Sequence, residues 1–225
     1  MQKDRYPIAA AIRATSGVLG VVPGSILSRA GLPHDLMTKD GPGITAAQFS
    51  ALWRALEVEV KDPTRLIALA RHVARGPFAP ALFAFVCSPD VATGVSRLAL
   101  FKPLVAPVRL IQGMAADGGL DVSIHSNDPD VALSPALATF ELIYLVECAR
   151  AYTGSPVVPR AVHLMQVSPM AGELEAYFEV PVQVTGTACV QLSAEDVRRP
   201  LITQNAELWS VFEKDLTQQL SLREQ

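Results

Sequence analysis

Residues 134–152 read SPALATFELIYLVECARAY, and this stretch decides the fold. Ser134 stands directly before Pro135, which is typical of a helix start: serine caps the free amides of the first turn, and proline needs no amide partner there. Behind this start, large apolar residues occupy more than one face of a helix over Pro135–Tyr152. A helix that is apolar nearly all round is buried nearly all round, so we expect it at the centre of the domain.

The chain before this segment carries start and stop signals of further helices. Thr45 and Gln48 have the spacing of a capping box, and Phe49 and Trp53 behind them fall on one apolar stripe. Asp62 and Ser88 each stand directly before a proline, as Ser134 does, and each predicts a helix start. The helices predicted in this half are Pro7–Leu19, Ser25–Ala30 with Gly31 as a left-handed cap, one behind Thr45, Pro63–Ala74 and Pro89–Lys102.

Strand patterns occur only in the second half. Val108–Met114 and Leu120–Ser126 flank a glycine-bearing connection suited to a hairpin, and apolar and polar residues alternate in the second of them. Two further strands are predicted at Arg160–Val167 and Gly186–Leu192, with a short helix at Gly172–Phe178 between them and a capped turn after Ser193. Helices first, then a small, mostly antiparallel sheet packed with helices, give the α+β class.

The last predicted helix, Asn205–Leu222, is amphipathic. Charged and amide side chains cover one face, and the apolar stripe on the other is Leu208, Phe212, Leu216 and Leu220. Such a stripe has to be buried, either on its own domain or across the two-fold axis of a homodimer. We expect the homodimer, because the helix lies at the end of the chain.

Composition limits the classes of function. Half of the 225 residues are hydrophobic and 18% are charged, so a sizeable core in one large domain is expected. The formal net charge of -3 disfavours duplex-DNA binding by this chain alone, since phosphate neutralisation requires a basic surface. The three cysteines are far apart, as for buried thiols in a reducing compartment. With no signal peptide and no apolar run of about 18 residues, we expect a cytoplasmic protein without a membrane partner.

The sequence contains no catalytic or metal-binding constellation. The four histidines lack a short metal-ligand spacing, and neither a nucleophile elbow nor a Walker-type loop is found. The glycines at 17, 20 and 24 follow a predicted helix, whereas a dinucleotide loop follows a strand. We therefore expect no enzyme activity, no metal site and no bound cofactor.

A small-molecule cavity between the buried helix and the sheet is our hypothesis for the site. Tyr144 and Cys148 on the helix, with His163 and Met165 on one face of the strand 160–167, combine apolar walls with a few polar groups. Arg109 would clamp an anionic ligand. The alternatives are a fully packed core, a surface position for His163 and an ordinary solvated Arg109.

Several segments resemble one subfamily of AraC-type bacterial transcription regulators. They are Leu32–Leu36, Ile44–Trp53, Asp62-Pro63 with Leu66, Leu82 with Ser88-Pro89, Pro159–Leu164, Pro169, Tyr177-Phe178, Pro181–Val184, and Leu192 with Arg199–Leu201. The likeness spans residues 8–220 and depends on order and spacing together. One departure is at Gln166, because the subfamily usually has a histidine before the proline-containing turn.

The resemblance implies an arabinose-binding-type N-terminal domain, which senses a small effector and pairs protomers. Residues 1–204 would form the sensing domain and 205–225 a linker and dimerisation helix, with DNA contacted only through a helix-turn-helix domain that this chain lacks. Aromatic residues make up 6% of the chain, which suits an apolar or amphipathic effector better than a sugar. The alternative is a haem- or ligand-binding sensor that acts through a protein partner, with His163 or His125 as axial ligand.

Overall fold

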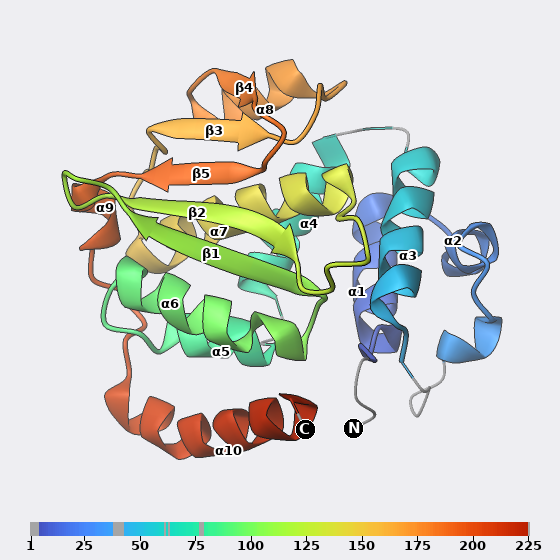
Figure 1. Cartoon of the computed structure of the whole chain (residues 1–225), viewed down its shortest axis with the longest axis horizontal. Helices are drawn as coiled ribbons and strands as arrows, with labels where there is room; N and C mark the ends of the chain where they lie inside the picture. Colours follow the sequence, from blue (N-terminus) through green and yellow to red (C-terminus); the bar gives the residue numbers. More distant parts are fainter. Residues whose placement is uncertain (1–4, 38–42, 61, 63, 77–78, 225) are drawn as a thin grey trace.

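The computed structural model describes residues 5–37, 43–60, 62, 64–76 and 79–224, and its N-terminal part is a group of helices. These are α1 (Ala9–Leu19), α2 (Pro23–Arg29), the 3-10 helix η1 (His34–Met37) and α3 (Ala46–Glu59), with α4 (Thr64–Arg75) leading to the main core. α1 to α3 share a small apolar core at one end of the molecule (Figure 1). The predicted capping box is present, because Thr45 and Gln48 bond reciprocally at 2.9 and 3.3 Å.

A five-stranded sheet forms in the second half of the chain. Its strands are β1 (Val108–Met114), β2 (Leu120–Ser126), β3 (Ala161–Leu164), β4 (Val182–Val184) and β5 (Cys189–Leu192), in the order β1-β2-β5-β3-β4. The β3–β4 pair is parallel and the other three pairs are antiparallel. The α+β class, with a small and mostly antiparallel sheet, is confirmed.

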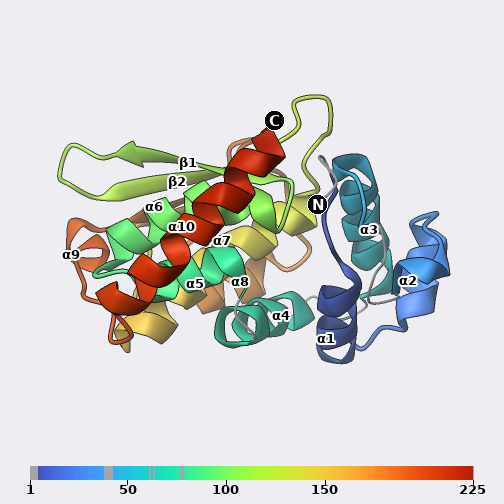
Figure 2. The same cartoon turned by 90° about the horizontal axis from the view of Figure 1, so that it is seen from below.

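The two faces of the sheet have different environments. Val108, Val122, Val162 and Val190 are fully buried on the face that packs on α6 (Val91–Phe101) and α7 (Pro135–Thr153). α5 (Pro80–Val86) and the 3-10 helix η2 (Lys102–Leu104) complete this layer. Figure 2 shows none of the described helices on the other side of β1 and β2.

α7 is the central helix, as its sequence predicts. The Ser134 hydroxyl accepts a hydrogen bond from the Leu137 amide at 3.4 Å, and Gly154 ends the helix in the left-handed conformation with φ 64°. Four consecutive residues, 142–145, are at most 4% exposed. Because consecutive side chains of a helix are about 100° apart, their burial leaves no face of this segment to solvent.

The predicted helix start at Ser88-Pro89 is wrong by two residues. α6 begins at Val91, and the Asp90 carboxylate caps it by accepting from the Thr93 amide at 2.7 Å. The Ser88 hydroxyl instead donates to the Ala84 carbonyl at 2.8 Å and closes α5, a helix that the sequence pattern does not reveal. Pro63, the predicted first residue of α4, lies outside the described residues.

The end of the sheet also differs from the sequence-based expectation. The strand predicted from Gly186 begins only at Cys189. β4 has three residues, which are too few to show an alternating pattern.

The short helix α9 (Ala194–Val197) is followed by α10 (Ala206–Glu224), which forms an outer layer over α5 and η2 (Figures 1 and 2). Trp209 and Leu216 are 6% and 4% exposed, and the Phe212 ring lies 4.7 Å from the ring of Phe83. Leu208, in contrast, is 40% exposed. Part of the apolar stripe is therefore buried on its own domain, the alternative to a dimer contact.

Among the described helices, none is by itself long and apolar enough to cross a membrane. α1 and α2 reach that length and composition only as a pair, and a bend of 111° separates them.

Candidate functional site

A cavity of about 390 Å³ lies between the N-terminal helices and the start of α7. α1, α3 and α4 supply one wall, the first turns of α7 a second, and the segment after β3 a third. Its volume is within the range of small-molecule pockets. The lining residues are Leu19, Trp53, Leu56, Glu57, Val60, Leu66, Leu69, Pro135, Ala136, Thr139, Met165, Gln166, Val167, Ser168, Pro169 and Met170.

The cavity wall is mostly apolar, and Glu57 is its one charged side chain among the described lining residues. Glu57 Oε1 accepts hydrogen bonds from the Ser134 hydroxyl at 3.1 Å and from the Ala136 amide at 2.9 Å. Its carboxylate therefore stabilises the first turn of α7, where free amides favour a negative partner. Thr139, Gln166 and Ser168 add uncharged polar groups.

Trp53 connects the cavity to the main core. Its side chain lines the cavity, yet the residue is only 8% exposed. Its ring lies 5.2 Å from the ring of Phe140, which in turn stacks on Tyr144 at 5.9 Å. An aromatic row therefore runs from the cavity wall along α7.

Tyr144 and Cys148, two of the predicted ligand contacts, lie together inside the core. They are 4% and 0% exposed. Burial raises the pKa of both groups, so both are uncharged at neutral pH. Neither of them lines the cavity.

The structure separates the other three predicted contacts. Met165 lines the cavity. His163 lies between the buried Val162 and Leu164 on β3 and therefore points to the face of the sheet away from α7. Arg109 is exposed on β1, in register with His125 of β2. The predicted pocket between α7 and the sheet is thus not formed by these residues, because strand alternation places His163 on the opposite side.

Two buried glutamates on α7 are functional candidates that local sequence patterns do not reveal. Glu141, 1% exposed, pairs with Lys102 Nζ at 2.7 Å. Glu147, 2% exposed, pairs with Arg75 Nη2 at 2.6 Å and accepts from the Tyr177 hydroxyl at 2.8 Å. The available signal was a carboxylate within a helix predicted to be buried all round, because a buried charge requires a partner.

The C-terminal end of α7 is bonded to the segment that leads into α10. The Ile202 amide donates to the Tyr152 carbonyl at 2.8 Å, and the Thr203 hydroxyl donates to the Val86 carbonyl of α5 at 2.7 Å. A displacement of α7 would therefore reach the base of α10 through direct contacts.

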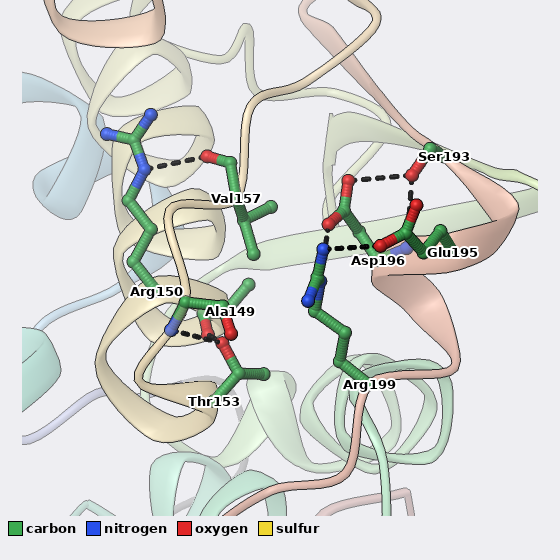
Figure 3. Close-up of polar contacts among 9 residues, drawn as sticks. Ala149, Arg150, Thr153, Val157, Ser193, Glu195, Asp196 and Arg199 are labelled. Atoms are coloured by element: carbon green, nitrogen blue, oxygen red, sulfur yellow. Dashed lines mark hydrogen bonds and ion pairs between the residues drawn. The ribbon is translucent and has the colours of Figure 1, made fainter.

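Side-chain bonds also form at the end of α7 and around α9 (Figure 3). Arg199 bonds to Asp196 and to Glu195, at 2.8 Å in each case. On α7, Arg150 Nε donates to the Val157 carbonyl at 2.7 Å. Arg199 therefore bonds within its own segment after α9, and Arg150 holds the loop between α7 and β3 against α7.

The model of the family described as the N-terminal arabinose-binding domain of AraC transcription regulators matches residues 20–201. The chain belongs to this family. The match includes α3, α4 and α7, between which the cavity of this AraC-type domain lies. The family is one of transcription regulators, which agrees with the resemblance found in the sequence.

The AraC-type domain also has the fold of part of a known crystal structure, that of the transcriptional regulator CdpR from Pseudomonas aeruginosa. The TM-score is 0.59 at 15% identity, and the likeness covers 92% of this chain and 64% of that chain. The chain thus spans less than two thirds of that structure. No significant relative is found among curated proteins.

Proposed function

We propose that this AraC-type domain binds a small apolar or amphipathic effector in the cavity between α3, α4 and the start of α7. The observation that carries the proposal is the position of the cavity between two parts of the protein: the helices α1, α3 and α4, and the start of α7 with the chain after β3. An effector bound there contacts both parts at once. Such a ligand favours the arrangement of the two parts that fits it best, and shifts the population toward it.

The proposed signal passes from the cavity through α7 to α10. Glu57 bonds to the first turn of α7, and the last turn bonds to Ile202 before α10. We propose that, in a longer cytoplasmic regulator, effector binding acts through these contacts on the relative position of the attached DNA-binding domains.

The proposed pairing of protomers has to use the apolar side chains of α10 that remain exposed on the domain. Leu216 is buried in its own domain, whereas Leu208, Val211 and Leu222 are 40%, 68% and 61% exposed. We propose that a second copy covers these three side chains, because a two-fold contact uses one patch twice. Leu208→Glu with Val211→Glu should then convert a dimer into a folded monomer. A monomer of the unmodified chain at tens of micromolar in light scattering would contradict the pairing.

The cavity is tested with an uncharged fluorescent probe, N-phenyl-1-naphthylamine. Its emission should rise on binding to the chain, and the Thr139→Phe variant should abolish the rise because the added ring fills the cavity. Thr217→Phe, at an exposed position of α10, is the matched control and should bind like the unmodified chain. Equal binding by both variants would refute the cavity as the effector site.

A further inference from the structure

The charge of the cavity restricts the class of effector, and the following inference rests on the proposed binding function. We infer that the effector is a cationic amphiphile: an ammonium group attached to an alkyl or arylalkyl body.

The cavity offers one negative charge and no positive one among its described lining residues. Glu57 is the charged group, and neither lysine, arginine nor histidine is found among those residues. Unlike charges within a few ångströms attract and like charges repel, and solvent weakens both effects at an exposed carboxylate such as Glu57. A carboxylate or phosphate in this cavity would face Glu57 without a counter-ion from the wall.

The group that would otherwise attract an anion is already occupied. The start of α7 projects amides toward the cavity, and such helix ends bind anions. Here the Ala136 amide donates to Glu57 Oε1 at 2.9 Å, and the Leu137 amide is taken by the Ser134 hydroxyl. Because the chain supplies its own carboxylate to this helix end, an anionic ligand gains little there.

The other lining residues suit both the ammonium group and the apolar body of such a ligand. Trp53 is one of the lining residues, and the face of an indole ring can stabilise an ammonium group. The rest of the wall that an alkyl body would contact is aliphatic or thioether, and its residues are Leu19, Leu56, Val60, Leu66, Leu69, Met165 and Met170.

The test compares three ligands that share one chain length: octylammonium, octanol and octanoate. Titrations use the intact chain with Trp209→Phe, which leaves Trp53 in the cavity as its single tryptophan. Quenching of Trp53 fluorescence then reports binding at this site. The expected result is octylammonium binding about tenfold tighter than octanol, the gain of one charge-assisted contact, and octanoate weakest of the three.

Glu57→Gln separates the charge from the shape of the cavity. The glutamine keeps an oxygen that can accept from Ala136 and Ser134, so the start of α7 is preserved. This variant should lose the preference for octylammonium and still bind octanol. Glu207→Gln removes the same charge from an exposed position of α10 and should leave the preference unchanged.

The outcomes distinguish the inference from the function on which it rests. Equal binding of all three ligands, or a preference for octanoate, overturns the cationic effector and leaves the amphiphile-binding cavity in place. Octylammonium preference that survives Glu57→Gln also overturns it. Failure of all three ligands to quench Trp53 overturns the effector site itself.

Discussion

The buried ion pair between Lys102 and Glu141 is where a single change should affect the stability of this domain most predictably. The two side chains are 6% and 1% exposed, and Nζ lies 2.7 Å from Oε2. Lys102→Met keeps much of the side-chain length and leaves Glu141 buried without its counter-ion. Removal of one partner from such a pair costs about 3–5 kcal/mol. For a chain of this size, that lowers the melting temperature by about 6–20 °C.

The double variant Lys102→Met with Glu141→Leu should restore most of this loss. Both desolvated charges are then gone, and apolar groups of similar volume take their place, a replacement that is often neutral or stabilising. Urea denaturation followed by circular dichroism gives the free energies of unfolding of the wild type, both single variants and the double variant. The resulting cycle yields the coupling energy of the pair.

The exposed pair between Arg160 and Asp117 provides the matched control. Its side chains are 48% and 53% exposed, so Arg160→Met should cost no more than about 1 kcal/mol. The reasoning about burial is refuted if Lys102→Met costs no more than this control. It is refuted equally if the double variant is as unstable as Lys102→Met alone.

Three further results are expected. Leu216 is 4% exposed, so Leu216→Ala should lower the free energy of unfolding in chemical denaturation by about 2–5 kcal/mol. Leu208 is 40% exposed, so Leu208→Ala should lower it by less than about 1 kcal/mol. Equal losses would contradict the packing of α10. Burial raises the pKa of Tyr152 to about 12, and burial also raises those of Tyr144 and Tyr177. The stability that these neutral phenols supply should be complete below the ordinary tyrosine pKa of 10.0 and should be lost as pH rises through their pKa values in the folded protein. Parallel measurements of phenolate absorbance and of denaturation against pH would check this. Finally, the chain, with its net charge of -3, should not bind duplex DNA, and salt-dependent micromolar binding in an anisotropy titration would disprove this.

Local chemistry predicted most elements of this fold from the sequence. The capping box at Thr45 and the serine–proline start at Ser134 both form as expected, because these signals depend on residues within one helical turn. The same signal failed at Ser88, where a neighbouring helix that the sequence did not reveal uses the hydroxyl. A capping residue identifies a helix end, but competing acceptors nearby decide which end it serves.

The candidate site could be predicted only in part. Met165 lines the cavity, whereas His163 points to the other face of the sheet; β3 ends at Leu164, so strand alternation no longer places the two side chains on one face. Alternation defines two faces of a strand without saying which face another element covers. Glu57 and Trp53 carry no local signal of binding, because each is an ordinary member of an amphipathic helix.

The sequence by itself determined the class of fold, the central helix and the family, because each depends on residue types at short or fixed spacings. The tertiary structure alone decided where the cavity lies and which charge it contains. Leu19, Glu57, Thr139 and Met165 come from four distant segments, and only packing of α1, α3 and α7 with the chain after β3 brings them to one cavity. The tertiary structure also decided which surface covers the apolar stripe of α10. Periodicity requires an apolar face to be buried, but the shape of the surrounding domain determines the elements on which that face packs.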